Sequence, residues 1–113
     1  MADFVYLIWN KGGKTPRWTA EEMRGHMQNW MQWTDGLTKG GHLKGGHHLE
    51  DRGKVVRGPK KTVIDGPYAE AKDVVAGILI VSAKSMDEAV ELSKGCPVLE
   101  GDWMVEVRPI GKM

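Results

Sequence analysis

Histidines are the side chains best suited to proton chemistry in this 113-residue chain. The four of them are His26, His42, His47 and His48. Because an imidazole titrates near neutrality, two imidazoles on facing surfaces can serve as acid and base. His26 falls on the apolar margin of an expected helix. His47 falls on the strand face that carries Leu43 and Leu49, which we take to be the helix-facing side. We therefore predict His26 and His47 as candidate catalytic residues; the alternative is that each is a half-buried histidine, hydrogen-bonded for structural reasons.

A third candidate catalytic residue is Asp65, which begins an Asp-Gly-Pro turn shortly before the most apolar run of the chain, residues 74–83. Its carboxylate could orient a histidine, or it could only cap the turn by accepting from backbone N–H groups, a contribution of about 1 kcal/mol. Glu70 and Lys72 follow two residues apart in an extended segment, so their side chains should point the same way. We expect them either as an exposed ion pair or as the charged rim of a pocket.

Trp30 and Trp33 place two large flat side chains beside His26 on the same expected helix. Aromatic walls with a few polar groups are typical of a small-molecule pocket, and Tyr68 would add a third wall. We therefore predict a ligand site between this helix and the sheet, with Trp30, Trp33 and Tyr68 as walls and Glu70 and Lys72 at its mouth. Aromatic residues at helical spacing can equally be plain core, which is the alternative for the two tryptophans.

Several function classes find no support in the sequence. Sixteen Lys and Arg against fifteen Asp and Glu give a formal net charge of +1, which does not favour nucleic acid or a membrane surface as a partner. No HExxH, CxxC or glycine-rich phosphate motif occurs, so we expect no metal and no cofactor. The single cysteine, Cys96, is interpreted as a small buried hydrophobe, and a lone cysteine favours a reducing compartment. With no bilayer-length apolar run and no signal-peptide pattern, we expect a cytoplasmic protein.

These candidate residues depend on the elements that carry them. Two capping boxes predict helix starts, one at Thr19–Glu22 and one at Ser85–Glu88, and glycines after about Thr38 and Lys94 predict the helix ends. Apolar or alternating runs predict the strands. They cover residues 4–9, 42–50, 74–83 and 103–108, with a small hairpin formed by residues 54–56 and 62–64.

The order of these elements predicts one α+β domain over residues 1–113. It is a ferredoxin-like split βαβ arrangement with an inserted β-hairpin, an antiparallel sheet and two helices on one face. Phe4–Trp9 and Gly77–Ala83 are apolar on both faces, yet two helices can cover only one face of such a sheet. Leaving large apolar side chains in water forfeits about 1.5–3 kcal/mol each, so we predict a homodimer whose sheets face each other.

A set of short motifs resembles the DGPF branch of the YCII-related proteins. They are Asp65–Lys72 (DGPYAEAK), Val75–Gly77, Asp87–Ala89, Gly95–Pro97 and Glu106–Pro109. The resemblance implies a dimeric α+β barrel, with a His and an Asp at a pocket. It also implies a gene neighbourhood that often includes an extracytoplasmic-function sigma factor. Tyr68 stands where the branch has Phe, and Trp30 stands where other members have a first-helix His, one turn after His26.

Two functions from different classes follow. The first is a cytoplasmic homodimer with a small-molecule pocket between the sheet and the first helix, with cofactor-free acid/base chemistry by His26, His47 and Asp65 as its enzymatic form. The second is a non-catalytic ligand-sensing or protein-interaction module linked to sigma-factor-dependent transcription.

Overall fold

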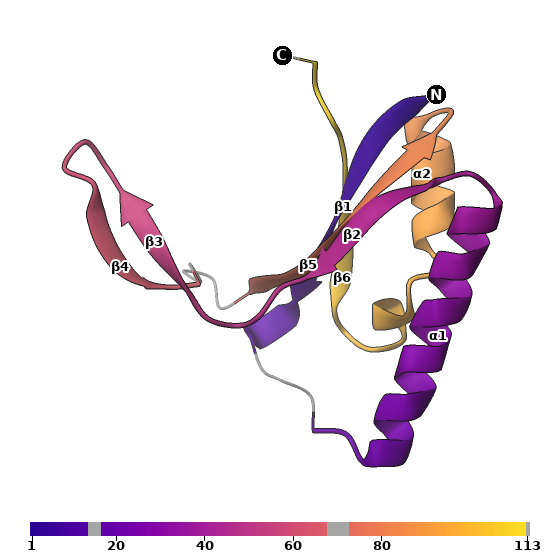
Figure 1. Cartoon of the computed structure of the whole chain (residues 1–113), viewed down its shortest axis with the longest axis horizontal. Coiled ribbons are helices and arrows are strands. Elements are labelled where there is room, and N and C mark those ends of the chain that lie inside the picture. Colours follow the sequence, from indigo (N-terminus) through magenta and orange to yellow (C-terminus); the bar gives the residue numbers. More distant parts are fainter. Residues whose placement is uncertain (14–16, 68–72, 113) are drawn as a thin grey trace.

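The computed structural model describes residues 1–13, 17–67 and 73–112. The strands and helices follow one another in the order that the sequence predicts (Figure 1). The strands are β1 (Ala2–Asn10), β2 (Leu43–His48), β3 (Gly53–Arg57), β4 (Thr62–Gly66), β5 (Val74–Ala83) and β6 (Met104–Pro109). The helices are α1 (Ala20–Lys39) and α2 (Met86–Ser93), with short 3-10 turns η1 (Lys11–Gly13) and η2 (Pro97–Glu100).

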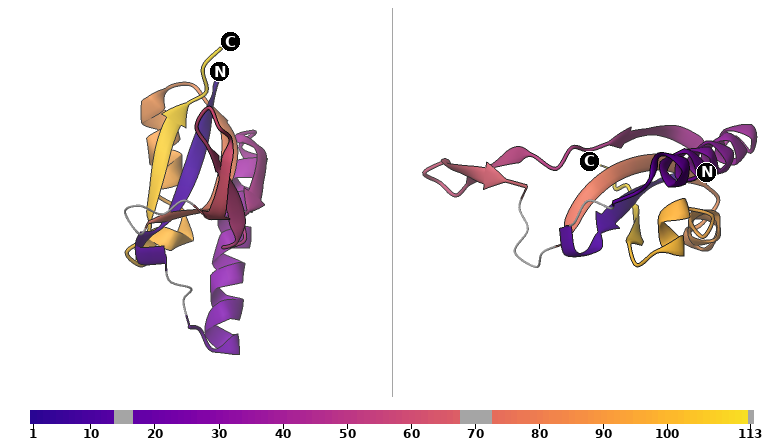
Figure 2. Two further views of the ribbon diagram at one scale, coloured as in Figure 1. Left: turned by 90° about the vertical axis from the view of Figure 1, so that its left-hand side faces the viewer. Right: turned by 90° about the horizontal axis from the view of Figure 1, so that it is seen from below.

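Four strands form one antiparallel sheet in the order β2-β5-β1-β6, and β3 and β4 form a separate two-stranded sheet. The two central strands, β5 and β1, are the two most apolar runs of the sequence, as expected for strands with neighbours on both sides. Both helices lie on the same side of the four-stranded sheet (Figures 1 and 2). The predicted ferredoxin-like α+β class is confirmed.

The core lies between the sheet and the two helices. Along β1, Phe4, Tyr6 and Ile8 are buried, and the matching residues of β5 include Leu79 and Val81. Leu37 of α1 and Ala89 of α2 close this core from the helix side.

The intervening residues point to the other side of the sheet, which neither α1 nor α2 covers (Figures 1 and 2). Val5 pairs with Ile80 and Leu7 pairs with Ile78, and these four side chains are half-buried in the single chain. We call this surface, defined by Val5, Leu7, Ile78 and Ile80, the bare face.

Both predicted helix starts are present. Thr19 accepts from the backbone N–H of Glu22 at 3.1 Å while Glu22 accepts from that of Thr19 at 3.1 Å, so α1 begins with a complete capping box. The start of α2 differs in one bond. Ser85 accepts from the N–H of Glu88, but the Glu88 carboxylate reaches the N–H of Lys84 at 2.9 Å, one residue earlier than a capping box requires.

The inserted hairpin of β3 and β4 extends away from the body of the molecule, on the side of the sheet opposite the helices (Figure 1). We call residues 53–66 the arm. Within the described part of the chain, neither helix is long and apolar enough to pass through a bilayer.

Candidate functional site

His26 lies on the second turn of α1, one turn before Trp30, so the two side chains are neighbours on the helix surface. The indole N–H of Trp30 donates to Nε2 of His26 at 2.8 Å. Trp18, which directly precedes the helix cap, packs against the imidazole with ring centroids 4.2 Å apart. We call Trp18, His26 and Trp30 the His26 cluster.

The hydrogen bond from Trp30 determines which imidazole nitrogen of His26 carries the proton. Because Nε2 accepts, a neutral imidazole must hold its proton on Nδ1. Nδ1 has no hydrogen-bond partner among the described residues, and the His26 side chain is only partly buried. His26 therefore presents an accessible N–H donor.

Burial lowers the pKa of His26 below its ordinary value, and the negative charge of Glu100 opposes that effect in part. The imidazole is thus neutral at pH 7. A neutral imidazole that presents an N–H can polarise a carbonyl or hold a carboxylate without carrying a charge itself.

Trp33, like Trp30, is partly buried and packs against the core. Its indole N–H donates to the carbonyl of Leu92 at 3.0 Å, and its ring stacks on Tyr6 with centroids 6.1 Å apart. The Tyr6 hydroxyl in turn donates to the carbonyl of Ala89 at 2.5 Å. These contacts join α1, β1 and α2, so the role of Trp33 is structural. Trp30 contacts both the core and His26.

His47 does not face the helices, so the expected sharing of a face with Leu43 is wrong. It pairs with Ile78 and lies on the bare face, exposed to solvent. The reason is a bulge between Leu43 and Gly45: Leu43 pairs with Val81 of the core, while Gly45 already pairs with Ile80 of the bare face. The sheet therefore separates His47 from His26.

Asp65 lies on the arm, where its carboxylate pairs with the ammonium group of Lys54, and both side chains are exposed. The arm and α1 are on opposite sides of the sheet, so Asp65 is also apart from His26 (Figure 1). Tyr68, Glu70 and Lys72 lie outside the described residues. The described part of the structure thus does not bring His26, His47 and Asp65 together within the chain.

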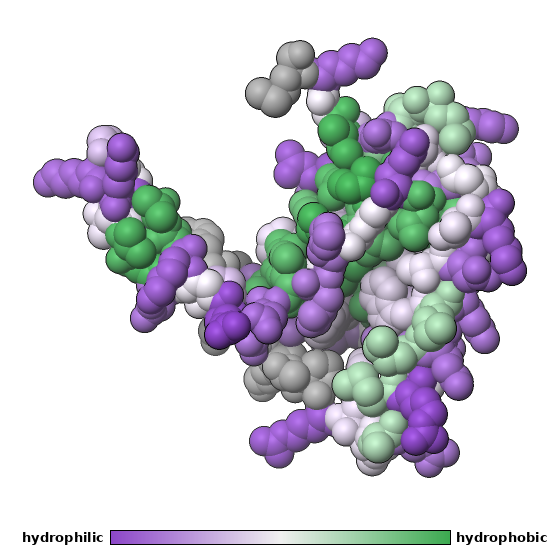
Figure 3. All heavy atoms as spheres, in the orientation of Figure 1, coloured by the Kyte–Doolittle hydropathy of each residue, from purple (hydrophilic) through white to green (hydrophobic). Residues whose placement is uncertain are grey.

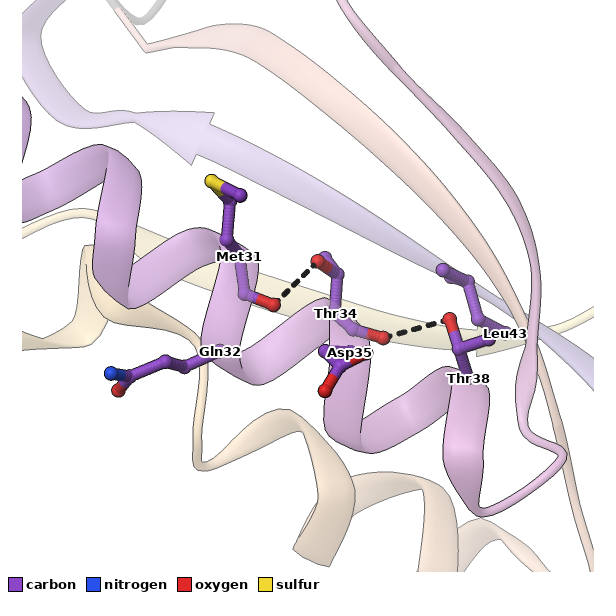
Figure 4. A pocket seen from close by; sticks show the side chains of 6 residues that line it. All are labelled: Met31, Gln32, Thr34, Asp35, Thr38 and Leu43. Atoms are coloured by element: carbon purple, nitrogen blue, oxygen red, sulfur yellow. Dashed lines mark hydrogen bonds between the residues drawn. The ribbon is translucent and has the colours of Figure 1, made fainter.

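An open groove of about 490 Å³ runs between α1 and the edge strand β2 (Figure 4). It is lined by Met31, Gln32, Thr34, Asp35, Thr38 and Leu43, none of which was predicted as a site residue. The hydroxyls of Thr34 and Thr38 donate to carbonyls one turn earlier in α1, and Asp35 pairs with Lys39 at 2.9 Å. Because the two hydroxyls and the Asp35 carboxylate already have partners within the helix, these three groups offer little to hold a ligand.

No group of three or more His, Cys, Asp or Glu side chains that could bind a metal ion occurs within residues 1–13, 17–67 and 73–112. Cys96 is buried, and burial raises the pKa of its thiol to about 11, as expected for an unreactive cysteine.

Sequence reasoning missed Trp18. An aromatic residue at the position just before a helix cap is a recognised signal, because it often packs against the first turns of the helix. Trp18 occupies that position before Thr19 and packs on His26.

The fold is of the α+β class, with both helices on one face of an antiparallel sheet (Figure 1). The most chemically distinctive feature of the structure is the neutral His26, which contacts Trp18 and Trp30. A family model, the YCII-related domain, matches residues 4–113. The chain therefore belongs to the YCII-related family, as the sequence motifs predict. Comparison with curated proteins gave no match.

Proposed function

We propose that this protein is a homodimeric small-molecule-binding protein of the DGPF type, and that the His26 cluster is its ligand site. The observation that supports this most directly is the hydrogen bond from Trp30 to Nε2 of His26, which leaves Nδ1–H as a free donor on a partly exposed side chain. A side chain used only for packing would not need an accessible polar atom oriented in this way.

The chemistry of the cluster selects a class of ligand. Two indole rings beside an imidazole favour a flat organic molecule, because aromatic faces offer large contact areas at low entropic cost. A neutral N–H donor favours a carbonyl or carboxylate oxygen on that molecule. We therefore propose a planar carboxylic or keto acid as ligand.

Cofactor-free proton transfer is the enzymatic form of this proposal. His26 as it lies can polarise a carbonyl through a hydrogen bond from Nδ1–H, while acceptance of a proton at Nε2 would require Trp30 to move. Catalysis by His26, His47 and Asp65 together would need residues from two subunits, because these three residues lie far from one another within a single subunit.

Ligand binding can be tested with benzoate and phenylpyruvate as probes, by calorimetric titration and thermal shift of the full chain. We expect saturable binding to the wild type, and about ten-fold or greater weakening in His26→Ala, since a hydrogen bond to a charged group contributes about 1.5–3 kcal/mol. His48→Ala is the matched control, because His48 is an exposed histidine on β2. Equal binding by the wild type and His26→Ala, or no binding of either probe, would count against the proposal.

The bare face supports the homodimer. Val5, Leu7, Ile78 and Ile80 form a continuous apolar surface on the two central strands, and a second copy of the same sheet would cover it symmetrically. A face-to-face dimer would also place His47 at the subunit interface. The near-neutral charge and the single buried cysteine support a cytoplasmic location without direct contact to nucleic acid.

A non-catalytic interaction module linked to a sigma factor is the second candidate. It is favoured by a row of exposed methionines on α1, namely Met23, Met27 and Met31, spaced one turn apart. Methionine side chains are flexible and polarizable, so they suit surfaces that adapt to a partner. In this case Met27→Gln would weaken partner binding and leave the binding of small ligands unchanged.

A further inference from the structure

The arm is a two-stranded sheet that stands apart from the rest of the protein. Among the described residues β3 pairs with β4 alone, and neither strand joins the four-stranded sheet. Its turn is closed by a bond from the N–H of Lys61 to the carbonyl of Gly58 at 3.0 Å. An isolated two-stranded hairpin is marginally stable in water, so an arm of this kind needs a surface to pack against.

Both sides of the arm carry apolar side chains. Val56 pairs directly with Val63 on one side, and they are 64% and 60% exposed. On the other side Val55 pairs with Ile64. Exposed valines on a hairpin contribute nothing to the core of their own chain, and an exposed apolar patch of this kind is typical of a surface that binds another molecule.

The position of the arm indicates where such a molecule would lie. The arm projects on the side of the sheet opposite both helices, which is the side of the bare face (Figures 1 and 2). Apolar side chains gather over the arm and over the sheet in the same view (Figure 3). Any molecule that covers the bare face must therefore lie beside the arm.

We propose that the arm is a dimer clasp, whose Val56–Val63 side packs against a second copy of this chain seated on the bare face. The clasp rests on the homodimer proposed above. In a two-fold dimer each subunit extends its arm to the other, so both arms make the same contact and every arm substitution acts twice.

The clasp can be tested by measuring the dimer dissociation constant by analytical ultracentrifugation of the full chain. We expect Val56→Thr/Val63→Thr, which keeps the shape and strand preference of both residues, to raise that constant by about ten-fold or more. Val90→Thr makes the same chemical change at an exposed site on α2, on the helix side of the molecule, and should leave the constant unchanged.

The possible results of this experiment distinguish a failure of the clasp proposal from a failure of the homodimer proposal. A wild-type protein that is monomeric at micromolar concentration overturns the homodimer and the clasp together. A wild-type dimer whose dissociation constant is the same in the arm variant as in Val90→Thr overturns the clasp alone.

Amide hydrogen exchange of residues 53–66 gives a second measurement that does not depend on the arm variant. Ile80→Glu places a charge on the bare face and should give a monomer. The arm amides should then exchange about ten-fold faster in Ile80→Glu than in the wild-type dimer. Equal exchange rates in a monomeric Ile80→Glu and the dimeric wild type would overturn the clasp.

Discussion

The imidazole of His26 carries its proton on Nδ1 because its Nε2 accepts from Trp30 across one turn of α1. Burial adds to this by lowering the pKa of His26, so that the neutral form is retained at pH 7. A single indole N–H thus decides both the tautomer and the direction in which the histidine can donate.

Replacing Trp30 by Phe tests this tautomer. The change keeps an aromatic ring but removes the indole N–H, so Nε2 of His26 loses its donor. We expect the wild-type His26 to show the Nδ1–H form in ¹⁵N NMR of the imidazole, and the variant to move toward the Nε2–H form. His42 is an internal control, because its Nδ1 lies 2.8 Å from the carbonyl of Ser82 and does not contact Trp30. An unchanged His26 spectrum would show that Trp30 does not set the tautomer.

The buried thiol of Cys96 should make the free energy of unfolding fall in alkaline solution. Burial raises the pKa of its thiol from 9.0 to about 11, so above pH 9 the unfolded chain loses a proton that the folded chain keeps. The free energy of unfolding should therefore fall as pH rises from 9 to 11, by about 2–3 kcal/mol in total. Tyr6, whose pKa is raised to about 12 by burial, adds a further fall above pH 10.

Urea denaturation at a series of pH values measures this effect. In Cys96→Ala the fall between pH 9 and 10 should be nearly absent, although the variant is less stable at neutral pH because a small buried group is lost. The same slope in the wild type and in Cys96→Ala would contradict the prediction.

At the scale of the elements, α1 and α2 are joined through Trp33. Its indole donates to the end of α2 at Leu92, and Gly95 lies directly against its ring. A Cβ added at Gly95 would come within 2.7 Å of Cδ1 of Trp33, closer than carbon atoms can approach. The glycine is needed here for space, since the Trp33 ring is already held by Leu92 and Tyr6.

Two glycine-to-alanine substitutions should therefore change the free energy of unfolding in opposite directions. Gly95→Ala is expected to lower the free energy of unfolding by about 1–3 kcal/mol through overpacking against Trp33. Gly36→Ala is expected to raise it by about 0.5–1 kcal/mol, because Gly36 lies inside α1 with open space where its Cβ would be. Urea denaturation of both variants measures these two changes in the free energy of unfolding. A neutral or stabilising Gly95→Ala would show that Trp33 can move aside.

The sequence predicts the elements well because their signals are local. The capping box at Thr19 and the glycines after Lys39 define α1, and the length of β5 is predicted to the residue. The side on which His47 lies could not be predicted, because it depends on a bulge that appears only when β2 pairs with β5. Counting alternate residues from Leu43 gives the wrong face once one extra residue enters the strand.

The candidate site was predicted less completely for a similar reason. His26 and Trp30 are one helical turn apart, so their contact follows from spacing within α1. Asp65 is distant from them because the arm leaves the sheet on the side opposite α1, a direction that turn residues alone do not specify.

At the scale of the whole molecule, the single chain is thin and wide, with extents of 46, 44 and 19 Å. One layer of helices covers one side of the sheet, and the other side has the bare face and the arm (Figure 2). Such a shape leaves the bare face of β1 and β5 without a covering layer. The sheet and the helices already form the two packed layers of an ordinary domain, and a second subunit would add a layer over the bare face.

If the native protein is a dimer, its thermal stability must depend on protein concentration, because only the folded chain dimerises. Each ten-fold increase in concentration adds about 1.4 kcal/mol per dimer, which corresponds to a rise in Tm of about 3 °C for two subunits of this length. Ile80→Glu, which places a carboxylate among Val5, Leu7 and Ile78, should melt at a lower temperature that does not change with concentration. Differential scanning calorimetry over a hundred-fold range of concentration measures both curves. A wild-type Tm that is independent of concentration across this range, for a protein that sediments as a monomer, would mean that the bare face is left to water, and the homodimer would have to be abandoned.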